Sequence, residues 1–199
     1  NGNHRFVKEG TNTATRLEGR VASGRRSGVY EVVRKERVAP VSTLLEIKAP
    51  EIARKCRAGQ FVITIVDEHG ERIPLTLADW DSHTGTIVIV FQQVGKTTYH
   101  MATLEPGDRF YAVTGPLGRP SEVENYGTVV CVGGGVGIAA IYPIACALHE
   151  AGNTVWSVVG CRNKELVFWE DKMAEVSDEL IVCTDDGSYK RKALVTEPL

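Results

Sequence analysis

A glycine-rich string, Gly133-Gly134-Gly135-Val136-Gly137, lies between two segments of opposite pattern. The β-branched run 128–132 before it predicts a strand, and the apolar residues of 138–150 after it recur at helical spacing. Glycines let a backbone approach a pyrophosphate closely, and a helix N-terminus offers N–H groups with a partial positive charge. The string therefore predicts a nucleotide loop. A turn that only allows tight strand-to-helix packing has the same composition, so the loop alone leaves both interpretations open.

A second string, Arg72-Ile73-Pro74-Leu75-Thr76, places an arginine and a hydroxyl residue close together on an extended segment. Alternation along a strand puts Arg72, Pro74 and Thr76 on one face, where a flat ligand would meet all three. An arginine can fork onto a pyrophosphate, and a threonine hydroxyl can hydrogen-bond a ring nitrogen. A strand with an ordinary surface arginine and threonine gives the same pattern.

A third string, Gly95-Lys96-Thr97-Thr98, precedes residues 99–104, for which we expect a helix. Small hydroxyl residues at a helix start are most often N-caps. The same geometry also offers N–H and O–H groups to a phosphate. The string is thus a second candidate for phosphate binding.

Other common chemistries find little support. The end of the expected strand 154–159 reads Gly160-Cys161-Arg162 and lacks the acidic residue that binds ribose hydroxyls in ordinary dinucleotide-binding dehydrogenases. No Ser-His-Asp or paired-carboxylate arrangement stands out. The histidines have no H-E-x-x-H spacing, and the cysteines form neither a disulfide framework nor a C-x-x-C pair, so we expect reduced thiols and no protein-bound metal. The five cysteines are Cys56, Cys131, Cys146, Cys161 and Cys183.

The elements around these strings predict two domains. Short β-rich runs at 30–38, 43–48, 61–67 and 86–94 predict a small antiparallel β-barrel. Beyond the turn-rich segment 114–120 the pattern alternates, with strands at 128–132, 154–159 and 180–183 and helices at 138–150 and 165–176. This order predicts an α/β doubly wound parallel sheet, with Pro143 near a helix start. We therefore expect a polar, poorly ordered extension over 1–28, a barrel over 29–120 and an α/β domain over 121–199.

Composition narrows the partners and the location. The chain has 199 residues, 43% of them hydrophobic, and a formal charge of −2 from 23 basic and 25 acidic residues. This balance gives no positive field for a phosphate backbone, so we expect no nucleic-acid partner. No stretch approaches the roughly 20 apolar residues of a membrane-spanning helix, and the first 30 residues show no signal-peptide core. We expect no membrane insertion and a cytoplasmic location.

Taken in order, six strings resemble the ferredoxin-NADP reductase superfamily: Arg-Ile-Pro-Leu-Thr, Gly-Lys-Thr-Thr, Gly-Pro-Leu-Gly, Gly-Gly-Gly-Val-Gly, Gly-Cys-Arg-Asn and Thr-Asp-Asp-Gly-Ser. Within it, the chain is most similar to the small electron-transfer subunits of NADH-dependent ferredoxin:NADP oxidoreductase, sulfide dehydrogenase and dihydroorotate dehydrogenase. The resemblance covers 29–199. It implies an FAD-binding barrel followed by a nicotinamide-binding domain, with the flavin at the seam between them.

The resemblance also implies roles for individual residues. Arg72 would bind the FAD phosphates, Thr76 would lie beside the reactive flavin edge as the catalytic position, and Pro74 and Leu75 would shape the flavin wall. Gly95, Lys96, Thr97 and Thr98 would close the FAD pyrophosphate. The dinucleotide side would be lined by Gly133 to Gly137, by Gly160, Cys161 and Arg162, and by Asp185, Asp186 and Gly187. The chain would take a hydride from NAD(P)H onto FAD and pass electrons singly to an iron-sulfur carrier or to a larger catalytic subunit.

Departures from the family pattern qualify these implications. Relatives continue beyond Thr-Asp-Asp-Gly-Ser and supply four cysteines for a [2Fe-2S] cluster, whereas this chain stops at Leu199 with no C-x4-C-x2-C spacing. We therefore expect an incomplete α/β domain without the cluster segment. Glycines usual near Lys190 and Ala193 are also missing, which leaves a non-catalytic scaffold subunit as the alternative. Arg162 and Lys164 would suit the 2′-phosphate of NADP(H), but the resemblance favours NAD(H), and we expect NAD(H).

Overall fold

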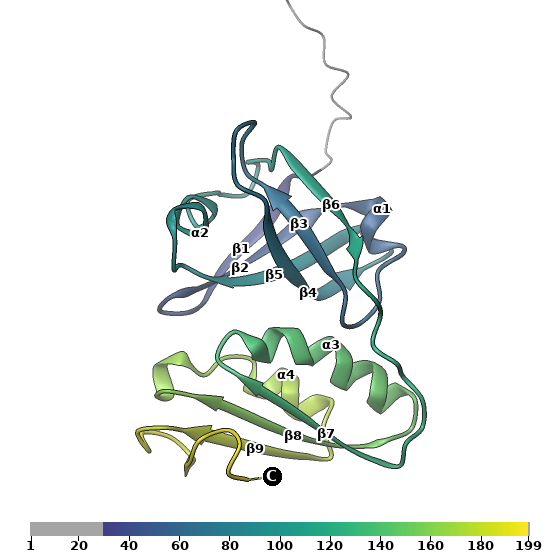
Figure 1. Cartoon of the computed structure of the whole chain (residues 1–199), viewed down its shortest axis with the longest axis vertical. Coiled ribbons are helices and arrows are strands. Elements are labelled where there is room, and N and C mark those ends of the chain that lie inside the picture. Colours follow the sequence, from purple (N-terminus) through teal and green to yellow (C-terminus); the bar gives the residue numbers. More distant parts are fainter. Residues whose placement is uncertain (1–29, 199) are drawn as a thin grey trace, which may run out of the picture.

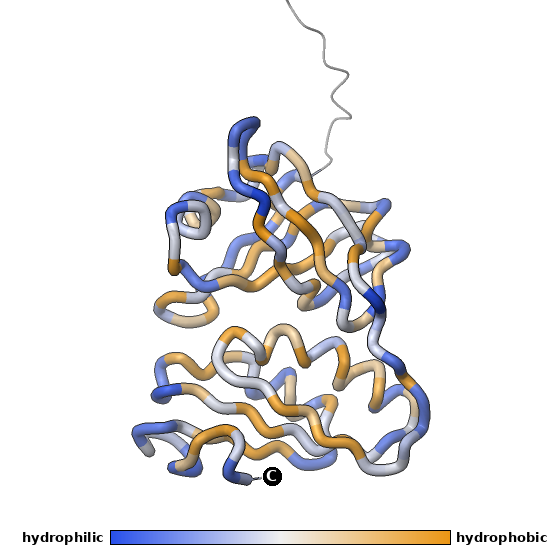
Figure 2. Tube along the Cα trace, viewed as in Figure 1, coloured by the Kyte–Doolittle hydropathy of each residue, from blue (hydrophilic) through white to orange (hydrophobic). Residues whose placement is uncertain are grey.

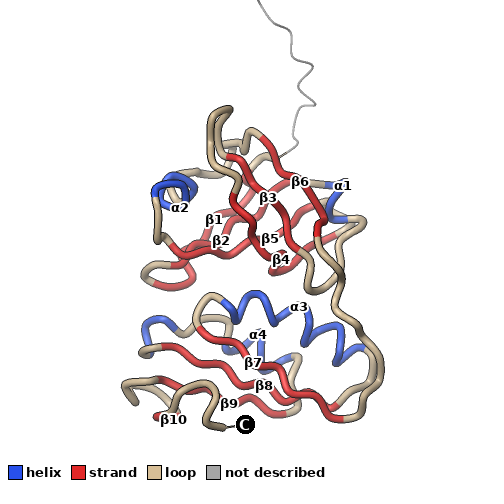
Figure 3. The backbone as a smooth tube through the Cα atoms, viewed as in Figure 1, coloured by secondary structure: helices blue, strands red, loops and turns tan. Residues whose placement is uncertain are grey.

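The computed structural model describes residues 30–198. The predicted extension 1–28 lies outside the described residues. Two β-sheets lie one above the other, joined by a connection without regular structure between residues 118 and 127 (Figures 1 and 3). The predicted domain boundary at residues 120 and 121 falls in this connection. The predicted order of a barrel followed by a parallel α/β unit is confirmed.

The first sheet is antiparallel and has the strand order β1-β2-β5-β4-β3-β6. Its ends meet before β1 and β6, where Glu31 bridges to Arg109 through the backbone and through a 2.8 Å salt bridge. This contact closes the sheet into a barrel. The strands are β1 Val32–Ala39, β2 Ser42–Lys48, β3 Phe61–Ile65, β4 Ile73–Asp81, β5 Thr86–Gln92 and β6 Ala112–Leu117, and the short helices are α1 Pro50–Ala53 and α2 Lys96–Met101.

Strand β5 is apolar on both of its faces. Ile87, Ile89 and Phe91 belong to the core inside the barrel, whereas Val88 and Val90 face the second sheet. Because successive strand side chains point to opposite faces, one β-branched run supplies both cores. Figure 2 shows the resulting apolar strands and the hydrophilic turns at the outer ends of the barrel.

The second sheet is parallel and has the order β10-β9-β8-β7. Helices α3 and α4 lie on the side of this sheet that faces the barrel (Figure 1). Side chains of both helices share a buried cluster with barrel residues, including Ala78, Val88 and Val90. The elements are β7 Thr128–Gly134, α3 Gly137–Glu150, β8 Thr154–Cys161, the 3-10 helix η1 Lys164–Leu166, α4 Glu170–Glu175, β9 Glu179–Thr184 and β10 Arg191–Lys192.

Three local predictions for helices were wrong. The single helix expected over 165–176 is two short pieces, because Val167 is extended and Trp169 adopts a left-handed backbone with φ 56°. Pro143 lies halfway along α3, where its ring is buried in the seam; packing there outweighs the lost backbone hydrogen bond. The helix expected over 99–104 begins at Lys96, because Thr98 caps it from inside the third string.

Within residues 30–198, no helix is both long and apolar enough to span a bilayer.

Candidate functional site

A cavity of about 650 Å³ lies where the carboxyl ends of β7 and β8 meet the barrel. It gathers seven of the residues predicted from the sequence: Gly134, Gly135, Val136, Gly160, Cys161, Arg162 and Asp185. The barrel contributes Val41, Ser42, Gln92, Gln93 and Val94, while η1 and the segments beside it contribute Leu166 and Phe168. Leu194, Val195 and Thr196 complete the lining. The cavity therefore joins the nucleotide loop to the barrel edge directly before Gly95.

The glycine loop is tightly packed at Gly133 and open at Gly137. A Cβ on Gly133 would lie 2.8 Å from Ile141 Cδ1 and 3.2 Å from Gly137 O, so Gly133 permits the close approach of β7 and α3. Gly135 has φ 54° and donates its N–H to Gly160 O at 2.8 Å. A Cβ on Gly137 would meet nothing within 4 Å. Within residues 30–198, the N–H groups of Val136 and Gly137 donate to no acceptor. This end of the loop therefore provides donors and space for an anion.

Backbone bonds align the ends of β8 and β9 beside the loop. Asp185 N–H donates to Cys161 O at 3.0 Å, and Asp186 N–H donates to Arg162 O at 3.1 Å. The buried Cys161 thiol donates to Leu166 O at 3.2 Å, and burial raises its pKa, so it is protonated at neutral pH. Cys161 therefore shapes the wall and is not a nucleophile.

Asp186 and Gly187 do not line this cavity. Asp186 accepts a 2.8 Å hydrogen bond from Ser188 N–H, and hydrogen bonds from the Ser188 side chain and backbone lower its pKa. Gly187 has φ 76°, and a Cβ there would lie 2.9 Å from Lys192 Cδ. Both residues shape the loop after β9. Lys190, where the family pattern has a glycine nearby, adopts a left-handed φ of 50°.

The second string lies at the start of β4. Pro74 pairs with Ile63 and Thr76 with Phe61 of β3, whereas Arg72 precedes the strand. Arg72 is exposed and forms no salt bridge within residues 30–198, so its guanidinium is available to an anionic ligand. Pro74 is exposed, and Leu75 and Thr76 are half-buried.

The third string lies beside the second. The Thr97 hydroxyl donates to the carboxylate of Glu71, the residue before Arg72. Thr98 Oγ1 accepts from Val94 N–H and Gly95 N–H at 3.0 Å each, so its hydroxyl caps α2. A Cβ on Gly95 would meet nothing within 4 Å, and Lys96 is exposed. The open positions are therefore Gly95 and Lys96.

This donor set fits a dinucleotide and a flavin cofactor in most respects. Within residues 30–198, Arg72, Lys96 and the N–H groups at the start of α3 are unpaired donors suited to phosphates. The fit is poorer at Thr97, whose hydroxyl would have to exchange Glu71 for a phosphate oxygen.

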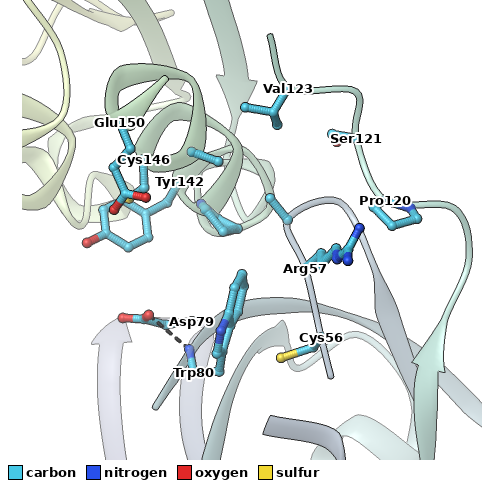
Figure 4. A pocket seen from close by; sticks show the side chains of 13 residues that line it. Cys56, Arg57, Asp79, Trp80, Pro120, Ser121, Val123, Tyr142, Cys146 and Glu150 are labelled. Carbon is cyan, nitrogen blue, oxygen red and sulfur yellow. Dashed lines mark hydrogen bonds between the residues drawn. The ribbon is translucent and has the colours of Figure 1, made fainter. Parts of the chain in front are cut away.

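A second cavity, of about 670 Å³, shares no lining residue with the first. Figure 4 shows it between β4 and α3, with Trp80 on one side and Tyr142 on the other. None of the residues predicted from the sequence lines it. Burial raises the pKa of Cys56 in its wall to about 11, which disfavours a thiolate. Within the described part of the chain, no group of three His, Cys, Asp or Glu residues could hold a metal ion.

The sequence reasoning missed the barrel contribution to the first cavity. Gln92 lies so close to the glycine loop that a Cβ on Gly135 would be 3.8 Å from Gln92 Nε2. The only available signal was chain adjacency, since Gln92 to Val94 directly precede Gly95. Leu194 to Thr196 gave no signal, because their position depends on contacts with Gly160 that the sequence does not reveal.

A barrel followed by a parallel sheet, with a glycine loop at their seam, defines the ferredoxin-NADP reductase-like class of proteins. A solved structure of this class, the NADH-dependent reduced ferredoxin-NADP oxidoreductase, matches with a TM-score of 0.81 and 45% identity, covering 85% of this chain and 61% of that chain. No protein-family model matches the chain.

Two curated relatives identify the family within this class. The homolog of the dihydroorotate dehydrogenase B (NAD(+)) electron transfer subunit from Thermotoga maritima is 47% identical over 173 residues, which are 87% of this chain and 61% of that protein. The corresponding subunit from Streptococcus pneumoniae strain R6 is 33% identical over 176 residues, which are 86% and 68% of the two chains. The chain belongs to the family of dihydroorotate dehydrogenase B electron transfer subunits. It spans about 61% of the length of the Thermotoga relative.

Proposed function

We propose that this chain is a flavin-dependent electron-transfer subunit. It takes a hydride from NAD(P)H onto FAD and passes electrons singly to an iron-sulfur carrier or a larger catalytic subunit. One observation carries the proposal: the barrel edge at Gln92–Val94 and the loops Gly134–Val136 and Gly160–Arg162 line the same cavity. Hydride transfer requires a flavin and a nicotinamide to meet, and this cavity joins the candidate dinucleotide loops to the barrel edge that directly precedes Gly95, the first residue of a candidate flavin segment.

The barrel, over residues 29–120, is the proposed flavin domain. FAD would supply the chemistry, by accepting a hydride and returning electrons one at a time. Arg72 is exposed and unpaired within the described residues, which suits the FAD phosphates. Thr76 is proposed to lie beside the reactive edge, and Pro74 and Leu75 to form the wall. Gly95 to Thr98 would hold the pyrophosphate, with Gly95 and Lys96 the most accessible.

The α/β unit, over residues 121–199, is the proposed nicotinamide domain. The N–H groups of Val136 and Gly137 would bind the pyrophosphate at the start of α3. Asp185 lines the cavity together with Arg162, and its carboxylate would accept from ribose hydroxyls, repel a 2′-phosphate and offset the charge of Arg162. We therefore propose NAD(H) rather than NADP(H). Asp186, Gly187 and Gly133 would act through the shape of the loops.

Absorbance spectroscopy tests the proposal directly. The purified chain, reconstituted with FAD, should show a protein-bound flavin spectrum that bleaches when NADH is added anaerobically. NADPH should bleach it at a higher concentration than NADH. A chain that cannot retain FAD would refute the proposal.

A second candidate is a non-catalytic scaffold subunit. Leu194 to Thr196 line the dinucleotide cavity, and a Cβ on Gly160 would lie 2.7 Å from Val195 Cβ, so this segment packs closely against the end of β8 and would compete with a nicotinamide placed there. Bound FAD with no response to NADH or NADPH would favour the scaffold. The larger catalytic subunit is the proposed partner in both cases, and copurification with that subunit would identify it.

A further inference from the structure

The side chain of Lys172 in α4 contacts three side chains: Asp79, Tyr142 and Trp169. Its Nζ lies 3.0 Å from Asp79 Oδ2 of β4. The same nitrogen lies 4.5 Å from the ring centroid of Tyr142 in α3 and 4.4 Å from that of Trp169, the residue before α4. Both rings are within the distance of a cation–π interaction. We call Lys172, Asp79, Tyr142 and Trp169 the Lys172 clamp.

The clamp connects the barrel to the α/β unit. Among the salt bridges within residues 30–198, only the one between Lys172 and Asp79 joins the barrel to the α/β unit. Figure 4 shows Asp79 on the barrel side of the seam and Tyr142 on the α3 side, facing one another. A charge pair that bridges two packed layers restrains how one layer can rotate or slide against the other.

A β-bulge aims Asp79 at the clamp. Leu77 pairs with Ile89 of β5 but Asp79 pairs with Val88, so two residues of β4 oppose one of β5. The bulge places Ala78 and Asp79 both on the outer face, whereas strict alternation would point Asp79 into the barrel. The other carboxylate oxygen, Asp79 Oδ1, accepts from Trp80 N–H at 2.9 Å and fixes the side chain.

A strained backbone places the second ring. Trp169 has φ 56° and ψ 27°, a left-handed conformation that is unfavourable for a bulky residue. It precedes α4 without making a side-chain cap hydrogen bond. Its ring instead packs edge-on against Tyr142, with centroids 5.4 Å apart, and thereby borders the Lys172 ammonium. The left-handed backbone of Trp169 thus places its ring in the Lys172 clamp.

The clamp lies on the elements that carry the proposed binding loops. Asp79 follows Thr76 on β4, and Tyr142 belongs to the helix that begins at Gly137. A rotation of α3 and α4 against β4 would therefore move the nicotinamide loop relative to the flavin segment.

We propose that Lys172 is a positioning residue, which holds the α/β unit against β4 so that the nicotinamide and flavin loops keep their relative orientation. This inference rests on the proposed electron-transfer function. Lys172 touches neither cofactor segment and acts through Asp79, Tyr142 and Trp169. The side chains of Lys172 and Asp79 are 38% and 41% exposed, and ion pairs with that exposure contribute little to global stability. Loss of the clamp should therefore change orientation in a chain that remains folded.

Two substitutions of Lys172 separate the effect of its charge from that of its packing, and a third substitution serves as a control. Lys172→Met keeps an unbranched apolar stem against the rings and removes the ammonium group. Lys172→Arg keeps the positive charge and a group that can stack on the two rings. The matched control is Lys35→Met, which removes a lysine-carboxylate pair of 2.6 Å with Glu105 inside the barrel domain.

Residual dipolar couplings on the cofactor-free chain measure the orientation itself. Both sheets should fit one alignment tensor in the wild type, Lys172→Arg and Lys35→Met, whereas Lys172→Met should require a separate tensor for each sheet. In the FAD-loaded chain, Lys172→Met should lower the rate of flavin reduction at saturating NADH by about tenfold or more, because small misplacements of reacting groups are costly. FAD affinity should stay within about twofold, since the phosphate contacts are intact.

A single shared tensor in Lys172→Met would overturn the inference, as would a reduction rate equal to that of the wild type. A Lys172→Arg variant as slow as Lys172→Met would also overturn it, because the charge would then not be responsible. If the wild type fails to bind FAD or to react with NADH, the proposed function fails. The alignment tensors are measured without cofactor and distinguish that failure from failure of the clamp.

Discussion

Gly133 and Gly137 lie at the two ends of one loop but have opposite surroundings. A Cβ at Gly133 would lie 3.2 Å from the Gly137 carbonyl oxygen, whereas a Cβ at Gly137 would meet nothing within 4 Å. We expect Gly133→Ala to lower the free energy of unfolding by about 1–3 kcal/mol through overpacking. Gly137→Ala should leave stability unchanged and weaken NADH binding, because its methyl enters the proposed anion space. Thermal unfolding and NADH titration check both. Equal melting temperatures for the two variants would contradict this assignment.

Arg72 provides the sharpest test of the flavin segment. Removing a charge-assisted contact to a phosphate costs about 1.5–3 kcal/mol, so Arg72→Gln should weaken FAD binding about 10- to 100-fold. Flavin fluorescence quenching during titration measures the dissociation constant. Arg54→Gln is the control, because Arg54 is also an exposed arginine of the barrel but pairs with Glu51 in α1. If both variants bind FAD as the wild type does, Arg72 does not hold the phosphates.

Local motifs could be predicted from the sequence, whereas contacts between residues distant in the chain could not. The glycine loop was recognisable because few sequences place such a string between a strand and a helix, and the structure puts Gly134 to Val136 in a cavity. The clamp was invisible, since Asp79 and Lys172 are 93 residues apart and each looks like a surface charge. Its geometry depends on a bulge and on a left-handed tryptophan, both of which arise from tertiary packing.

Among the elements, the turn between β4 and β5 has an acid-sensitive contact. Asp81 Oδ1 accepts from His83 N–H at 2.7 Å and Thr84 N–H at 3.2 Å, and the bonds to His83 and Thr84 lower the pKa of Asp81. A lowered pKa in the folded state means stabilisation above the unfolded value, lost as the pH falls through the folded value.

We therefore expect Asp81→Asn to narrow the difference in melting temperature between pH 6 and pH 3. Asparagine keeps an oxygen acceptor for the turn but does not titrate in this range. Calorimetry of the variant and the wild type at both values measures the change. An unaltered difference would mean that Asp81 does not contribute to the acid response.

Strands were easier to predict than helices for a physical reason. Every strand predicted from a β-branched run is present within a few residues, because its buried side chains pack into at least one apolar core. The helices after β8 are short and depend on how Phe168 and Trp169 pack, so the periodic pattern over 165–176 overstated their length. The two-residue strand β10 carries no sequence pattern at all.

At the scale of the whole molecule, one buried cluster crosses the seam. Leu44, Ala78, Val88 and Val90 of the barrel pack with residues of α3, α4, β7, β8 and β9. A second cluster, which includes Leu45, fills the barrel interior. Because Leu44 and Leu45 are neighbours on β2, the two cores share a wall. The barrel and the α/β unit should therefore unfold as one cooperative unit, although they have different sheets.

Leu45→Ala tests that cooperativity, since Leu45 is fully buried in the barrel core and does not belong to the seam cluster. The substitution should cost about 2–5 kcal/mol. If the molecule is one unit, hydrogen exchange should accelerate equally for the most protected amides of β2 and of β8, because both exchange through global unfolding. Calorimetry should show a single transition at a lower temperature. Leu44→Ala, on the seam side of the same strand, should give the same pattern. Faster exchange in β2 with unchanged protection in β8 would show that the barrel opens alone.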